Sequence, residues 1–260
     1  MLKTKTVIQL IILIVTIEVQ ASGQGILNTE KYGQNLGKAF LVAGTFGYEG
    51  ARGNSNLNKT DFELLTSYHI NSHVFRLVGG FNYLNSSGKV ITSNIYSQLR
   101  YNHVFTNRLQ SFTFYQVQKN DILLVKRREL LGAGLRIALV RKDSSRISFD
   151  AGIGGMYENE LLNRPDSITE QVSANNYFRM SDFLSFRYKH KNIVIVNVMY
   201  VQPLVNYFRD FRLYNDLSIQ FRIRKNLSFE TGFVYRYDSR PPGDLEMTDL
   251  NFKNAIIVKF

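Results

Sequence analysis

Apolar and polar residues alternate strictly in one stretch near the end of the chain, NLSFETGFVYRYDS, residues 226–239. One set of alternate positions is mostly apolar or aromatic: Leu227, Phe229, Thr231, Phe233, Tyr235 and Tyr237. The other set is Ser228, Glu230, Gly232, Val234, Arg236 and Asp238. A period of two residues puts the two sets on opposite faces of a β-strand. We therefore predict a strand here with one oily face and one mainly polar face.

Segments of the same kind follow one another from about residue 38 to the last residue, and no stretch shows a helical period of convincing length. Tight polar turns are predicted near residues 71, 107, 143, 191 and 225. They alternate with longer connections, which we expect at residues 50–56, 85–89, 119–127, 158–176, 203–210 and 239–246. This spacing predicts six hairpins and about twelve strands, with both ends of the sheet on the side of the short turns.

The oily face of these strands could be covered by a second sheet or by lipid, and alternation alone does not separate the two. The predicted strands exceed the ~5–6 residues of ordinary strands and reach the ~9–11 that a tilted membrane strand needs. Aromatic residues near both strand ends would form the two girdles of a membrane barrel. They are Tyr48, Tyr83, Tyr157, Tyr200 and Tyr237 toward the long connections, and Tyr68, Tyr101, Phe149, Tyr188 and Phe229 toward the short turns.

The first 21 residues have the features of a secretory signal peptide. Lys3 and Lys5 precede a largely apolar run at residues 7–17, and Val19-Gln20-Ala21 supplies the small or modest residues of a cleavage site. This run is shorter than the ~20 residues of a membrane-spanning helix. We therefore predict a signal peptide at 1–21, a periplasmic N-terminal segment at 22–37 and a barrel at 38–260. Whether the segment at 22–37 also enters the barrel is left open.

The C-terminal stretch DLNFKNAIIVKF places Leu250, Phe252, Ile256, Val258 and Phe260 on one face. An alternating strand that stops at an aromatic residue resembles the signal that hands outer-membrane barrels to the barrel-assembly machinery, which would implicate Phe260, Val258 and Ile256. Unpaired backbone groups are too costly in hydrocarbon for an open sheet. We predict an all-β protein of the cell outer membrane: a closed, antiparallel, up-and-down transmembrane β-barrel of about twelve strands, with short periplasmic turns and longer extracellular loops.

The hairpin GYEGARGNSNLNKTDFELLTSY, residues 47–68, supports the same location. A strand ending in aromatic residues and glycine, a Gly53-Asn54-Ser55 loop and a following alternating strand resemble the opening hairpin of the YdiY-like family of salt-induced outer-membrane proteins. The resemblance implies an outer-membrane barrel and no reaction.

The charge of the chain bears on its partners. The formal net charge is +11, and removal of residues 1–21 takes away two Lys and one Glu, which leaves +10. For an exported protein this favours outer-membrane lipid and lipopolysaccharide over nucleic acid. Loop residues Arg52, Lys59, Lys126, Arg127 and Arg128 are the candidates for contact with lipopolysaccharide phosphates, with a merely solvated basic rim as the alternative.

The polar faces are predicted to line the lumen. Our candidates are Arg76, Arg100, Arg136, Arg179, Arg187, Arg222, Arg236, Asp150, Asp216 and Glu230, together with Arg212, Lys253, Asp61 and Glu63. The positive excess would favour anions in a narrow channel, whereas a network of ion pairs would fill the lumen. Barrels of ~8 strands are filled and those of ~16 hold water, so both interpretations stay open. The apolar run at residues 122–125 either folds inward as a constriction or extends a strand.

We predict no enzymatic activity and no catalytic, cofactor or metal site. The chain has no cysteine, and His69, His73, His103 and His190 all fall near the short turns, away from the outer surface. Glu158, Glu160, Asp166 and Glu170 lack the spacing of a calcium loop and are assigned to a hydrophilic loop. The function we expect is that of a structural or stress-related envelope protein. The alternatives are a partner-binding barrel in a secretion or uptake assembly and, third, an outer-membrane hydrolase.

Overall fold

The computed structural model describes residues 26–29, 39–51, 57–86, 89–141, 146–164 and 171–260. Its strands are β1 (Phe40–Ala51), β2 (Leu57–Ile70), β3 (His73–Ser86), β4 (Lys89–Val104), β5 (Leu109–Asn120), β6 (Val125–Arg141), β7 (Ile147–Arg164), β8 (Gln171–Met180), β9 (Asp182–His190), β10 (Ile193–Leu204), β11 (Tyr207–Arg222), β12 (Leu227–Asp238) and β13 (Thr248–Lys259). No helix within the described ranges is long and apolar enough to cross a membrane.

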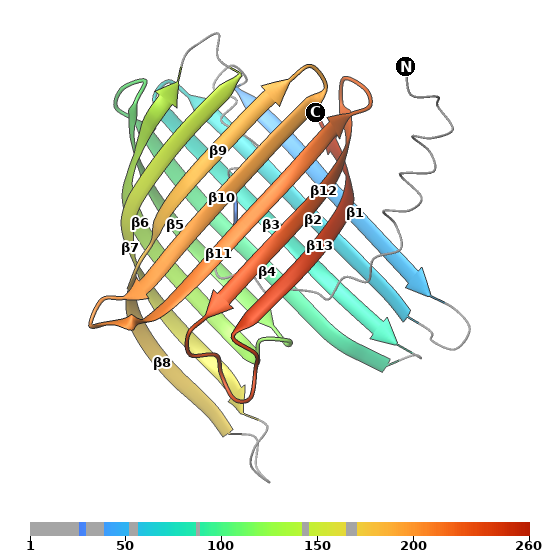
Figure 1. The fold of residues 1–260 in the computed structure, drawn as a ribbon, viewed down its shortest axis with the longest axis vertical. Helices are drawn as coiled ribbons and strands as arrows, with labels where there is room; N and C mark the ends of the chain where they lie inside the picture. Colours follow the sequence, from blue (N-terminus) through green and yellow to red (C-terminus); the bar gives the residue numbers. More distant parts are fainter. Residues whose placement is uncertain (1–25, 30–38, 52–56, 87–88, 142–145, 165–170) are drawn as a thin grey trace.

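The strands form one closed antiparallel ring (Figure 1). β8 and β9 both pair with β7 and β10 and are separated only by Ser181, so they act as one bent strand and the ring has twelve. Pairing of β1 with β13 closes the ring, from Ala43 opposite Lys259 to Phe46 opposite Ile256. The backbone N–H of Phe260 donates to the Val42 carbonyl at 2.9 Å. The predicted twelve-stranded barrel is confirmed.

The barrel has two distinct ends. We call the end with the connections at residues 71–72, 105–108, 191–192 and 223–226 the turn end; the C-terminus lies there too (Figure 1). The opposite loop end carries the connections at 121–124, 205–206 and 239–247. Asn71 and Lys191 adopt positive φ angles of 52° and 49°, the left-handed conformation that two-residue hairpin turns require.

The strand faces follow the sequence pattern. In β12, Glu230, Val234, Arg236 and Asp238 are buried inside, whereas Phe233 and Tyr235 are exposed on the outer wall. Large apolar side chains are exposed on the outer wall of other strands as well, which suits a surface that faces hydrocarbon. The oily face is therefore the outside of the barrel, and the polar face is its interior.

Two predicted long connections are wrong because strands continue through them. β7 extends to Arg164 and β8 begins at Gln171, so most of the predicted loop at 158–176 is strand. β10 and β11 likewise leave only residues 205–206 of the predicted loop at 203–210. Charged residues suggested loops at these positions, but in a barrel with a polar interior they occupy the inward face of the strands.

Residues 26–29 lie inside the barrel, all at most 6% exposed. The backbone N–H of Leu27 donates to Oε1 of Gln116 on β5 at 3.0 Å. The side-chain amide of Asn28 donates to Oδ2 of Asp216 on β11 at 2.9 Å. These two strands lie far apart around the ring. The described part of the segment predicted to be periplasmic, 22–37, therefore enters the lumen and bridges distant walls; the remainder falls outside the described residues.

Candidate functional site in the barrel lumen

An apolar cluster covers part of the loop end. Leu123 and Val125, from the β5–β6 hairpin, pack with Leu162 of β7 and are buried. Leu245, from the β12–β13 connection, packs against them. Because β6 and β12 lie on opposite sides of the ring, this connection reaches across the mouth. Of the two interpretations of residues 122–125, the inward fold is the one observed.

An ionic layer lies within the same end of the barrel, and its centre is Glu158 on β7, whose side chain is fully buried. Its carboxylate accepts from Arg128 on β6 at 2.8 Å, from Arg179 on β8 at 3.1 Å and from Arg212 on β11 at 2.7 Å. Arg212 and Glu158 are 54 residues apart in the chain, and two wall strands separate β7 from β11 in the ring. The layer therefore runs through the interior of the barrel between strands that do not pair with each other.

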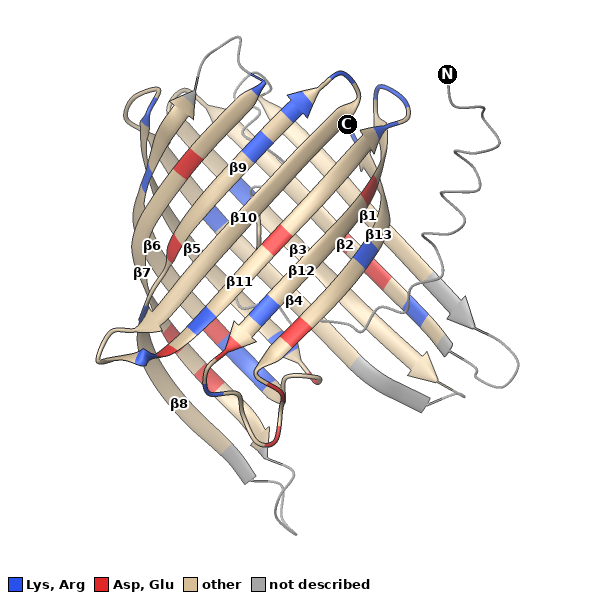
Figure 2. Ribbon diagram, viewed as in Figure 1, with Lys and Arg blue, Asp and Glu red and all other residues tan. Residues whose placement is uncertain are grey.

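The layer extends through further ion pairs. Arg179 reaches Asp210 at 2.9 Å, Arg212 reaches Asp238 at 3.0 Å, Arg236 reaches Asp249 at 3.2 Å, and Arg128 also pairs with Glu160. Among the described residues the layer contains four arginines and five carboxylates, so it carries no cationic excess. Figure 2 shows acidic and basic positions intermixed toward this end. Buried charges are tolerated when they are paired in this way.

Aromatic residues fill the middle of the lumen. Phe112 lies 5.9 Å from Phe183, centroid to centroid, Phe183 lies 5.5 Å from Tyr200, and Ile26 of the inserted segment packs in the same cluster. Inward-facing glycines make room for these rings: a Cβ at Gly152 would overlap the Phe183 ring. A second apolar cluster joins Leu27 to the walls of β1, β2 and β3.

The sequence-predicted lumen residues occupy different depths. Eight are buried on the inner face: Arg76, Arg100, Arg136, Arg179, Arg236, Asp150, Asp216 and Glu230. Arg187 is half-buried, and Arg222, the last residue of β11, is exposed at the turn end and does not line the interior. Nearer that end Arg136 pairs with Asp150 at 2.8 Å, and the side-chain amide of Gln220 donates to Glu230 at 2.8 Å.

The sequence interpretation missed six of the nine charged residues of the ionic layer, Asp249 of β13 among them. Arg128, Glu158, Glu160 and Asp210 were assigned to loops, and Asp238 was not singled out as charged lining. The alternation of Glu158 and Glu160 with Tyr157, Asn159 and Leu161 was the available indication of a strand. This alternation was overlooked because two acidic residues so close together are usual in loops.

Two other loop hypotheses need correction. Arg128 points inward to Glu158 and Glu160, and Lys59 is buried, so neither belongs to a basic rim for lipopolysaccharide. Lys126 and Arg127 are exposed, and Arg52 is outside the described residues. Glu158 and Glu160 are held by arginines, whereas Asp166 and Glu170 are not described. In the part of the chain that the structure covers, no group of three or more His, Asp or Glu side chains could hold a metal ion.

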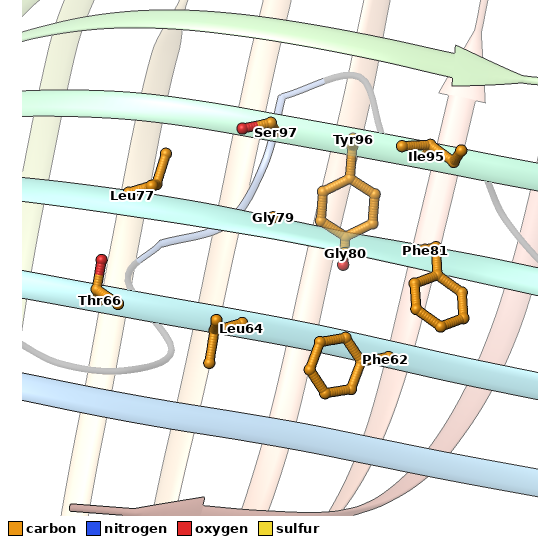
Figure 3. A pocket seen from close by; sticks show the side chains of 10 residues that line it. All are labelled: Phe62, Leu64, Thr66, Leu77, Gly79, Gly80, Phe81, Ile95, Tyr96 and Ser97. Carbon is orange, nitrogen blue, oxygen red and sulfur yellow. The ribbon is translucent and has the colours of Figure 1, made fainter.

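The outer wall carries a hollow of about 450 Å³ over β2, β3 and β4 (Figure 3). Its rim consists of exposed apolar side chains, among them Phe62, Leu77 and Ile95, and its floor includes Gly79, Gly80 and Ser97. These floor residues have small side chains or none, so the hollow reaches close to the backbone of the sheet. The lining of the hollow is almost entirely apolar, as suits a hydrocarbon-facing surface.

Comparisons with known proteins agree with this architecture. A family model described as "Protein of unknown function, DUF481" matches residues 44–260. No curated protein matches the chain.

Solved structures show a similar fold at low sequence identity. The translocator domain of the autotransporter NalP from Neisseria meningitidis is 10% identical, with 85% of this chain and 86% of that chain covered and a TM-score of 0.50. The NanC porin is 11% identical, with coverages of 85% and 98% and a TM-score of 0.49. The likeness to the translocator domain shows the fold alone, that of an outer-membrane β-barrel.

Proposed function

Because the chain belongs to the DUF481 family, whose function is unknown, and folds as an outer-membrane-type barrel, we propose that it is a structural or stress-related envelope protein whose lumen is closed at rest. The observation that carries the proposal is the contact of Glu158 with arginines from three different strands. A pore wall needs side chains that leave the lumen free, whereas Glu158 and Arg212 extend from strands that do not pair with each other and meet inside it.

Three successive layers support a closed lumen. The apolar cluster around Leu123 lies at the loop end, the ionic layer lies within the same end, and the inserted residues 26–29 pack among the central aromatic rings. A hydrated ion would have to displace all three. The described carboxylates of the ionic layer are held by arginines, so none is poised as a general base, and we propose no catalytic role.

Single-channel recording in planar bilayers tests the closed state. We expect the folded full chain to insert without steady conductance at moderate voltage. Folding is verified by the shift of gel mobility on boiling, insertion by flotation of the chain with lipid vesicles, and detergent alone serves as the blank. A stable, ohmic conductance in most insertions would contradict the proposal, and anion selectivity of that conductance would favour the narrow channel instead.

We also propose that the last strand is read by the barrel-assembly machinery and that the wall is embedded in outer-membrane lipid and lipopolysaccharide. Ile256 and Phe260 lie exposed on the outer face of the barrel, and Val258 lies on the same face. Phe260→Ala should lower the fraction of folded, heat-modifiable protein in cells, whereas Leu250→Ala, on the same face of β13, should not. Equal folded fractions would contradict this role. The hairpin at 47–68 supports placing the chain with the YdiY-like proteins.

A further inference from the structure

Arg100 on β4 is a buried cation to which the described residues supply no hydrogen-bond acceptor. Its side chain is 1% exposed, and within the described part of the chain none of Nε, Nη1 and Nη2 has a partner. The carbon at the centre of its guanidinium lies 4.7 Å from the centroid of the Phe112 ring. The ring lies against the guanidinium, and a ring face offers no conventional acceptor to its N–H groups. An isolated buried charge is strongly unfavourable unless a counter-charge compensates it.

The residues beside Arg100 bring a second positive charge and a buried amide to this part of the inner face. Arg76 on β3 lies directly opposite Arg100 in the strand register, and it too is buried on the inner face. Like charges at opposed positions destabilise a sheet. Asn102, the next inward residue of β4, is 2% exposed, and in the residues that the structure covers both polar atoms of its side chain lack a partner.

Three buried carboxylates of the inner face have partners of their own. Asp150 accepts from Arg136 at 2.8 Å, Glu63 accepts from the Tyr96 hydroxyl at 2.6 Å, and Asp216 accepts from the Asn28 amide at 2.9 Å. Among the described carboxylates none forms an ion pair with Arg100. This contrasts with the ionic layer at the loop end, where every arginine has a carboxylate. The missing counter-charge is therefore expected from a bound solute.

We propose that a small oxyanion, a carboxylate or a phosphate, binds inside the barrel against the N–H edge of Arg100, with Arg76 and the Asn102 amide as the further donors. A guanidinium presents parallel N–H groups that match two oxygens of such an anion. The site adjoins the inserted segment: Gln98, two residues before Arg100, donates to Gln116 at 2.9 Å, and Gln116 also accepts from Leu27. This inference deepens the proposed function, since it places a solute within the closed lumen.

Equilibrium dialysis of the folded full chain in detergent tests the site, with labelled inorganic phosphate and labelled acetate in separate arms at constant ionic strength in chloride. We expect saturable binding of one anion per chain in at least one arm. Arg100→Met should weaken that binding at least tenfold. Arg222→Met is the control: it removes an arginine that is exposed at the turn end of β11 and does not line the interior, and should bind as the unmodified chain does.

Thermal unfolding gives a second readout that does not depend on the first. In buffer without phosphate or acetate, Arg100→Met should unfold at the same or a higher temperature than the unmodified chain, because it removes an uncompensated buried charge. The anion that binds should then raise the unfolding temperature of the unmodified chain alone.

The outcomes separate the possible ligands. Binding in the phosphate arm only assigns a phosphate site, binding in the acetate arm only assigns a carboxylate site, and binding in both assigns a general oxyanion site. No saturable binding in either arm, or equal binding by Arg100→Met, overturns the inference. Conductance is not involved in these measurements, so an open pore would refute the proposed function and leave this result interpretable.

Discussion

Substitution of Glu158 by Gln is the sharpest test of the ionic layer, because one change removes the negative charge that three arginines share. The carboxylate lies 2.7–3.1 Å from nitrogen atoms of Arg128, Arg179 and Arg212 and is fully buried. Each of the three arginines keeps at least one other carboxylate partner, so the substitution leaves none of them as an isolated buried charge. Removing one partner of a buried ion pair costs about 3–5 kcal/mol, and we expect the lower part of that range.

For a chain of this size 1 kcal/mol corresponds to roughly 2–4 °C in the unfolding temperature. We therefore expect Glu158→Gln to lower the unfolding temperature in detergent by roughly 6–12 °C. The chain has no tryptophan, so circular dichroism of the β-structure is the suitable signal, recorded at one fixed heating rate.

Glu129→Gln is the matched control. Glu129 lies on β6 next to the layer but is turned to the outside, where it pairs with the exposed Arg127 at 2.6 Å. Water screens such a pair, so its loss should leave the unfolding temperature nearly unchanged. If the two variants unfolded at the same temperature, the ionic layer would not stabilise the barrel and our account of the lumen would be wrong.

Two further predictions concern the middle of the lumen. Gly152→Ala should destabilise the barrel by about 1–3 kcal/mol, because the added Cβ overlaps the Phe183 ring in a packed interior; Gly44→Ala, with open space at its Cβ, should have little effect in the same unfolding assay. The double variant Gln116→Ala, Asp216→Ala removes the side-chain acceptors of the Leu27 and Asn28 hydrogen bonds given above. This variant should show intermittent conductance in planar bilayers, where the unmodified chain shows none. If the variant also showed no conductance, these hydrogen bonds would not be what holds the inserted segment in place.

The sequence was sufficient for the strand pattern because that pattern is local. Alternation over ten or more residues fixes which side chains share a face, whatever the strand pairs with, and this identified the outward Phe233 and Tyr235 and the inward Glu230 and Arg236 correctly. The tight turns at residues 71–72 and 191–192 were equally predictable, since they too depend on neighbouring residues. Closure followed from the cost of unpaired backbone groups in hydrocarbon.

The contents of the lumen could not be read in this way, because they depend on contacts that exist only after the ring closes. Glu158 meets Arg212, 54 residues away, through the curvature of the wall, and Asn28 meets Asp216, 188 residues away. No periodicity encodes which inward side chains face one another across a barrel. The same positions that look like a hydrophilic loop when read along the chain become a neutralised ionic layer once β7 and β11, which do not pair with each other, bring their charges together.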